Sequence, residues 1–155
     1  MSMKLLAIGN VLMGDDAVAI YLATKLQDEL TQLGIEVFYA ETDIEYCITC
    51  INDGDYIIFV DAADFGGVTG EVSLLSFDDI FISSSEKLVT GHGINFLDII
   101  KLYELKIQGV ILAVQIADIS FRYGLSEELQ NQFSDCASQI MKHINKVNAK
   151  NENRN

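Results

Sequence analysis

The sequence has few basic residues, few cysteines and no long apolar run. Its 10 lysines and arginines are outnumbered by 23 aspartates and glutamates, which gives a formal net charge of −13. A surface with this charge repels the phosphates of nucleic acids and of anionic membranes, so we expect neither as a partner. Such a charge suits a basic segment or a metal cation, and it also keeps a protein soluble.

The other two shortages exclude a secreted disulfide scaffold and a membrane protein. Three cysteines, an odd number, do not suggest a disulfide framework. No apolar run in the sequence approaches the roughly 20 residues that span a bilayer. The first residues lead directly into a strand-like segment without the apolar core of a signal peptide. We therefore expect a cytoplasmic protein.

Short apolar runs alternate with helix-like segments along the chain. The strand-like runs lie at residues 4–8, 35–40, 55–60, 70–75 and 110–116, and the helical patterns at 16–33, 44–51, 94–105 and 127–147. This alternation predicts an α/β fold, a three-layer α/β/α sandwich with a mostly parallel twisted sheet of about five strands. We expect one domain at residues 1–147, a loop at 83–86 and a polar disordered tail at 148–155.

The turn after the first predicted strand ends in two aspartates. The segment GNVLMGDD, residues 9–16, has glycines spaced as in a phosphate-binding loop, but Asp15 and Asp16 stand where that loop has lysine and serine or threonine. Two carboxylates repel a phosphate, so the turn does not predict a nucleotide site. A helix cap accounts for one aspartate and leaves the other for a different role.

Two further polar residues follow apolar or glycine-rich segments. Asp61 comes directly after the apolar run at residues 57–60, and His92 lies between two glycines before a predicted helix. A loop-capping aspartate and an inert surface histidine are the ordinary explanations. However, ligands bind beyond the carboxyl ends of parallel strands, so Asp16, Asp61 and His92 are predicted to meet at one rim of the sheet. Two carboxylates and an imidazole suit nickel, zinc or iron, with coordination positions left open.

Cys47 and Cys50 form a CxxC motif, which is found in redox pairs and in zinc sites. The sequence has no second CxxC to complete a zinc site, and the motif does not directly follow a strand as a thioredoxin-type pair does. We interpret both cysteines as small apolar residues of a short helix that packs against the sheet.

Four segments occur in order along the chain: AIGNVLMGDDAVAI, IIFVDAADFGG, TGHGINFLDII and VILAVQIADISFRYGLSEELQ. Their order and spacing, over about residues 4–145, resemble the hydrogenase maturation endopeptidases, which trim the large subunit of nickel–iron hydrogenases. The resemblance implies a peptidase that removes the C-terminal extension of the large-subunit precursor after nickel insertion. Asp16, Asp61 and His92 are its implied catalytic and metal-contacting residues.

The resemblance also implies that the substrate supplies the nickel, so the enzyme would carry no tightly bound cofactor of its own. We expect the precursor to be its partner, and the enzyme itself to be a monomer. The sequence shows no serine or cysteine nucleophile with a histidine partner, which favours attack by water with an aspartate as a candidate base, an aspartic-type peptidase. The alternative is a non-proteolytic assembly factor that recognises the nickel site without cutting.

The chain departs from the family pattern in the loop after the second strand. Members of the family usually have a glycine pair before a threonine there, whereas this chain has Glu41, Thr42 and Asp43. We expect this difference to affect how the substrate tail is held and which hydrogenase is served.

Overall fold

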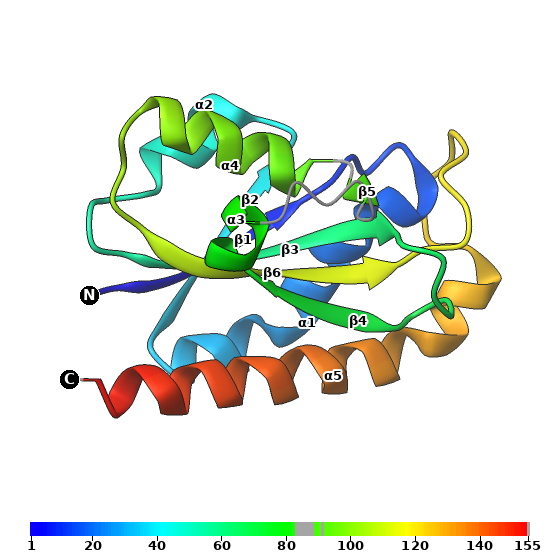
Figure 1. Ribbon diagram of the computed structural model, residues 1–155. Helices are drawn as coiled ribbons and strands as arrows, with labels where there is room; N and C mark the ends of the chain where they lie inside the picture. The colour runs from blue at the N-terminus through cyan, green and yellow to red at the C-terminus, as the bar shows by residue number, and fades with distance from the viewer. Residues whose placement is uncertain (83–88, 91, 155) are drawn as a thin grey trace.

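The computed structural model describes residues 1–82, 89–90 and 92–154, and a β-sheet runs through its centre (Figure 1). The strands are β1 (Met3–Ile8), β2 (Ile35–Glu41), β3 (Tyr56–Asp64), β4 (Val72–Ser76), β5 (Val89–Thr90) and β6 (Gln108–Gln115). The helices are the 3₁₀ turn η1 (Gly14–Ala17), α1 (Val18–Gln32), α2 (Ile44–Thr49), α3 (Phe77–Ile82), α4 (Gly93–Leu102) and α5 (Glu127–Glu152).

Five strands of the sheet lie in the order β2-β1-β3-β6-β4, and the sixth, the two-residue strand β5, pairs with β3 off this path. The neighbours β2, β1, β3 and β6 are parallel, whereas β4 and β5 are antiparallel to their partners. The prediction of a mostly parallel sheet of about five strands is confirmed. The four parallel strands bring their carboxyl ends to one edge, which is where the turns of interest begin.

Helices cover both faces of the sheet, so the predicted three layers are also confirmed. Figure 1 shows α1 and α5 on one face and α2, α3 and α4 on the other. Each face has its own apolar core. One is built from residues of α1, α5 and the strands, and the other from residues of α2, α4, the start of α3 and the strands.

The strand β1 shows why this sequence forms a central strand. All six of its residues are buried, as both faces of a covered parallel sheet require. The one charged residue among them is Lys4, whose Nζ lies 2.7 Å from Oδ2 of Asp55 and donates to the carbonyl oxygen of Cys50 at 2.8 Å. These contacts compensate the cost of burying its charge.

The C-terminal residues correct one prediction. The disordered tail expected at residues 148–155 is wrong for 148–152, because α5 continues to Glu152. Val147 and Asn151 lie one turn apart on one face of this helix and are both buried, so the end of α5 stays packed. Asn148 also donates a hydrogen bond from Nδ2 to Oε1 of Glu152 at 3.2 Å.

Two smaller differences follow from local geometry. The helix expected over residues 16–33 begins at Val18, because residues 14–17 form the tighter 3₁₀ turn η1. The short helix α3 has too few residues to show a period in the sequence. The loop expected at 83–86 lies outside the described residues.

Among the described helices, none combines the length and the apolar composition needed to cross a membrane.

Candidate functional site

Gly9 sets the turn that follows β1. Its φ is +150°, and a Cβ atom at this position would overlap the backbone carbonyl of Asp16. Only glycine permits this close approach of the two backbone segments. The turn then rises through η1, which carries Asp15 and Asp16. The tight glycine turn therefore returns Asp16 to the end of the strand that the chain has just left.

Asp16, Asp61 and His92 meet at the edge formed by the carboxyl ends of the parallel strands. Nε2 of His92 lies 3.2 Å from Oδ2 of Asp16, and the same oxygen accepts a hydrogen bond from the backbone N–H of Asn10 at 2.8 Å. The carboxylate of Asp61 accepts a hydrogen bond from the backbone N–H of His92 at 3.2 Å. His92 therefore contacts both carboxylates, one through its ring and one through its backbone.

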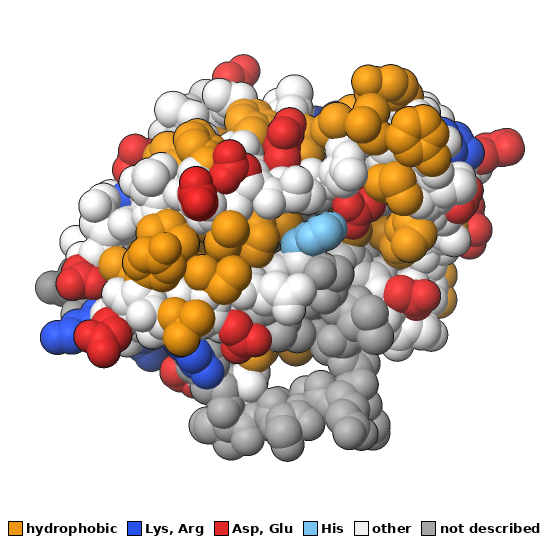
Figure 2. Space-filling model, turned by 90° about the horizontal axis from the view of Figure 1, so that it is seen from above, with side chains coloured by type: hydrophobic (Ala, Val, Ile, Leu, Met, Phe, Trp, Pro, Cys, Tyr) orange, Lys and Arg blue, Asp and Glu red, His pale blue; other side chains and the backbone are white. Residues whose placement is uncertain are grey.

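Solvent reaches the three side chains unequally. Asp61, within β3, is fully buried, whereas the side chains of Asp16 and His92 are 15% and 31% exposed. Figure 2 shows a histidine side chain at the surface of the face that carries α2 and α4, with acidic and hydrophobic side chains around it. The ring of His92 is thus the member of the group that an incoming molecule meets first.

The electrostatics of Asp16 and His92 agree with an ion pair. Burial raises the pKa of Asp16, but the hydrogen bonds from His92 and from the Asn10 backbone, together with the charge of His92, hold this pKa below its ordinary value of 3.8. The hydrogen bond to Asp16 raises the pKa of His92 above 6.5; burial opposes this shift, and the charges of Asp16 and Asp61 add to it. The imidazolium and the carboxylate stabilise each other's charged forms.

This group can exchange a proton or accept a cation. The 3.2 Å between Nε2 and Oδ2 fits two ligands of one ion, because atoms about 2.0 Å from a tetrahedral metal lie about 3.3 Å apart. Asp61 instead faces the backbone of His92. In the part of the chain that the structure describes, no three His, Cys, Asp or Glu side chains are arranged to hold a metal ion together. The residues meet as predicted, but as a hydrogen-bonded group.

Asp15 has a structural role that differs from the predicted one. Its carboxylate is fully buried and accepts four hydrogen bonds: from the N–H and hydroxyl of Ser126 at 2.6 and 2.8 Å, and from the N–H groups of Ala117 and Asp118 at 2.9 Å each. Ser126 is the N-cap of α5. Asp15 therefore fixes the loop between β6 and α5. The alternative that one aspartate caps the following helix does not hold, because neither η1 nor α1 has a side-chain cap.

That same loop carries an exposed apolar surface that sequence reasoning missed. Its backbone pairs with the turn after β1, since the N–H of Gly14 donates to the carbonyl of Arg122 at 3.0 Å and the N–H of Arg122 to that of Leu12 at 2.9 Å. The large exposed side chains beside this pairing, named here the apolar rim, are Leu12, Ile119, Phe121 and Tyr123. The available signal was the run ISFRY, in which large apolar residues alternate outside any predicted strand.

The backbone conformation of Glu41 is the unusual feature of the loop after β2. Its φ is +52°, in the left-handed region that glycine adopts readily and other residues adopt at a cost of about 1–2 kcal/mol. The carbonyl of Glu41 accepts a hydrogen bond from the N–H of Gly9 at 2.9 Å, which holds the two loops together. An exposed carboxylate therefore stands where the backbone favours glycine, at the same edge as Asp16.

The CxxC motif lies in the apolar core, as expected from the sequence. Cys47, Cys50 and Cys136 are free thiols and are buried. Burial, with smaller effects of Cys50 and Asp43, raises the pKa of Cys47 to about 12. A thiol with this pKa is protonated at neutral pH and is a poor nucleophile or metal ligand. The interpretation of Cys47 and Cys50 as packing residues agrees with these surroundings.

Comparison with known proteins gives the family. The model of the hydrogenase maturation protease family HycI matches residues 20–143. Asp61 and His92 lie within this range, and Asp16 lies just before it. No curated protein matches the chain significantly by sequence.

Solved structures of several such proteases share the fold. The [NiFe] hydrogenase maturation protease HybD from Thermococcus kodakarensis superposes with a TM-score of 0.75 at 23% identity, over 92% of this chain and 98% of that one. The hydrogenase maturating endopeptidase HybD from E. coli gives 0.73 at 14% identity, over 95% and 94%. HycI from Thermococcus kodakarensis KOD1 gives 0.61 at 21% identity, over 91% of each chain.

The family match defines a peptidase, a hydrolase of peptide bonds. The chain belongs to the hydrogenase maturation protease family.

Proposed function

We propose that this protein is an endopeptidase that removes the C-terminal extension of a nickel–iron hydrogenase large-subunit precursor after nickel has been inserted. Family membership supports the reaction class. The observation that carries the proposal for this chain is the contact between Asp16 and His92 at 3.2 Å, held in place by the buried Asp61. A partly exposed pair of carboxylate and imidazole suits a cation presented by another protein.

The nickel of the precursor takes the place of the proton between Asp16 and His92. Their atoms Oδ2 and Nε2 have the separation of two ligands of one ion, and imidazole and carboxylate are both suitable ligands for nickel. Asp61, whose carboxylate holds the His92 backbone, completes the proposed nickel-contacting group. Because the substrate brings the metal, the enzyme needs no cofactor of its own.

Water is the proposed nucleophile. Its oxygen bonds to the carbonyl carbon of the scissile peptide, the C–N bond breaks, and a proton from the water passes to the amine of the released peptide. Among the described residues, the ring of His92 is paired with the carboxylate of Asp16 and not with a hydroxyl or thiol. Nickel held by Asp16, Asp61 and His92 places the scissile bond, and an aspartate of this group is the candidate base.

The apolar rim is the proposed docking surface for the precursor. Leu12 belongs to the turn that carries Asp16, and Phe121 and Tyr123 flank the residue that pairs with this turn. Contiguous exposed apolar side chains mark protein–protein contacts more often than random surface does. A large folded substrate would therefore contact the rim while its nickel site reaches His92.

The proposal is tested by incubating the protein with purified precursor, nickel-loaded or nickel-free, and weighing the precursor by mass spectrometry. We expect the nickel-loaded form alone to lose the mass of its C-terminal peptide. A precursor that binds but keeps its full mass would support the alternative, a non-proteolytic assembly factor. Equal cleavage of both forms would contradict recognition through nickel.

A further inference from the structure

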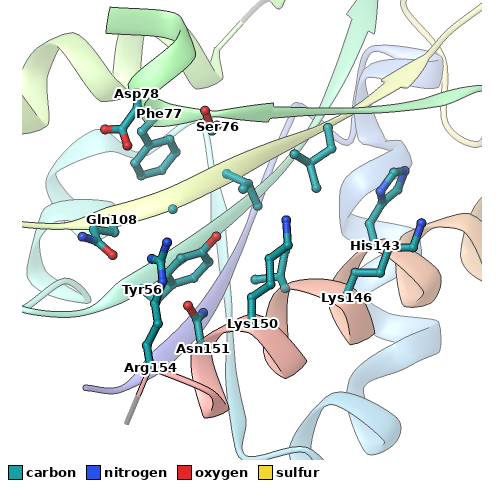
Figure 3. Close-up of a pocket in the computed structure, with 14 residues that line it drawn as sticks. Tyr56, Ser76, Phe77, Asp78, Gln108, His143, Lys146, Lys150, Asn151 and Arg154 are labelled. Carbon is teal, nitrogen blue, oxygen red and sulfur yellow. The ribbon is translucent and has the colours of Figure 1, made fainter.

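A cavity lies at the opposite edge of the sheet from Asp16 and His92. It has a volume of about 370 Å³ and lies where β3 and β6 begin and β4 ends, with the last turns of α5 as its other wall. Figure 3 shows Lys150 reaching from α5 toward these strands, with Asn151 and Arg154 on one side of it and Lys146 and His143 on the other. The peptidase site uses none of these residues.

The cavity gathers basic side chains in an acidic protein. His143, Lys146, Lys150 and Arg154 all line it. The first three lie three and four residues apart on one face of α5, and Arg154 follows just after the end of this helix. Lys146, Lys150 and Arg154 are three of only ten lysines and arginines in the chain. Within the described residues, the ion pairs are Lys4–Asp55 and His92–Asp16, so the charges in the cavity have no carboxylate partner there.

The side-chain amide of Asn151 is independent evidence that a ligand binds in the cavity. It lines the cavity between Lys150 and Arg154 and is only 5% exposed. Its Nδ2 is buried and has no hydrogen-bond partner among the described residues. Buried donors are almost always satisfied in folded proteins, so a donor left open beside three cations indicates an acceptor that binds there.

The cavity also has apolar lining. Tyr56, Leu74 and Val110 from the strands and Val147 from α5 line it, beside the polar residues Ser76, Asp78 and Gln108. Pockets for small organic molecules have volumes of about 300–1,000 Å³ and combine apolar walls with a few placed polar groups. This cavity has that size and that mixture, and it exceeds what a bare inorganic ion would fill.

We propose that this cavity binds a small organic anion, whose phosphate or carboxylate group contacts Lys146, Lys150, Arg154 and Asn151 while its apolar part lies against Tyr56. The proposal stands independently of the proposed peptidase function. The net charge of −13 does not prevent binding, because charges farther away than about 8 Å are largely screened at physiological ionic strength. Close to the cavity, Asp78 is the one acidic residue among its lining residues.

Calorimetric titration of the full chain at physiological ionic strength tests the proposal with three probes: AMP, citrate and inorganic phosphate. We expect saturable one-to-one binding of AMP or citrate, at least tenfold tighter than that of inorganic phosphate. Tighter binding of AMP would assign the site to organic phosphates, and tighter binding of citrate would assign it to polycarboxylates. Absence of saturable binding for all three probes would overturn the proposal, and equal affinity for AMP and inorganic phosphate would overturn its organic part.

Two variants separate this site from general charge attraction. Lys150→Glu should weaken the binding of the preferred probe at least tenfold, whereas Lys142→Glu, on the same helix but outside the cavity, should change it less than twofold. Equal losses in both variants would contradict a specific site. Asn151→Leu removes the Nδ2 donor that has no partner. This variant should bind the preferred probe more weakly, and its ligand-free form should have a higher melting temperature than the wild type. A lower melting temperature with unchanged binding would refute the role of Asn151.

Discussion

Oδ2 of Asp16 lies 3.2 Å from Nε2 of His92, although the two residues are 76 positions apart in the sequence. The turn after β1 carries the first residue, and the start of α4 carries the second. Asp61, in β3, holds the backbone of His92 from the neighbouring strand. The parallel strands make this convergence possible, because their carboxyl ends share one edge.

The pKa of His92 should lie above 6.5 in a histidine NMR titration, because the carboxylate of Asp16 stabilises the imidazolium. In Asp16→Asn the hydrogen-bonded negative charge is gone, and the pKa of His92 should fall toward its ordinary value. The signals of His143, on α5, should not change between the two proteins. An unchanged pKa of His92 in the variant would contradict the ion pair.

The same shifts set the pH range in which the pair stabilises the fold. The contribution of His92 is complete below about 6.5 and is lost as the pH rises through its raised pKa. The contribution of Asp16 is present above 3.8 and is lost as the pH falls through its lowered pKa. Urea unfolding of the wild type and Asp16→Asn should therefore differ most between these values, and only modestly because both side chains are partly exposed.

Asp15 and Asp16 should respond in opposite ways to the same substitution. Asp15→Asn places an amide against four donors and should lower the free energy of unfolding by about 2–4 kcal/mol. Asp16→Asn should cost about 1 kcal/mol or less and abolish cleavage. Denaturant unfolding and the precursor mass assay measure the two effects. Equal destabilisation by both changes would contradict the division of roles.

Gly9→Ala should abolish cleavage, because the added Cβ would push against the carbonyl of Asp16 and displace its side chain. Gly54→Ala is the matched control: Gly54 also has a positive φ, +87°, but nothing lies within 4 Å of an added Cβ there. The control should cost about 1–2 kcal/mol of stability and retain cleavage. If both variants kept full activity, the close approach at Gly9 would not position Asp16.

The double variant Cys47→Ala/Cys50→Ala should retain cleavage and lose stability by about 1–2 kcal/mol, because the two thiols fill apolar space. In the folded wild type, Cys47 should resist thiol reagents since burial raises its pKa to about 12. A loss of cleavage in a folded double variant would favour a redox or metal role for the motif.

The sequence predicts the layers of this fold and the three residues that meet at its edge. Strand β1 is continuous in its apolar character because it is covered on both faces, and α1 repeats its buried residues every three or four positions. Asp16 and Asp61 follow from the rule that polar residues near the carboxyl ends of parallel strands gather at one edge. His92 follows the antiparallel strand β5, so its arrival at this edge depends on the contacts with Asp16 and Asp61.

The sequence does not show which aspartate of the pair faces the site. The buried carboxylate of Asp15 accepts hydrogen bonds from Ala117, Asp118 and Ser126, which lie more than 100 residues away in the sequence. No local sequence pattern indicates such contacts. The polar residues after Val147 look like a frayed end, yet packing of Asn151 keeps them helical. Long-range contacts override local composition in both places.

The most direct test of the account is the mass of nickel-loaded precursor after incubation with the wild type, Asp16→Ala, Asp61→Ala, His92→Ala and, as a control, His143→Ala. Circular dichroism would confirm that each variant is folded. We predict that the wild type and His143→Ala release the C-terminal peptide, and that the other three leave the precursor at its full mass. Cleavage at the wild-type rate by folded Asp16→Ala, Asp61→Ala and His92→Ala would contradict the central claim.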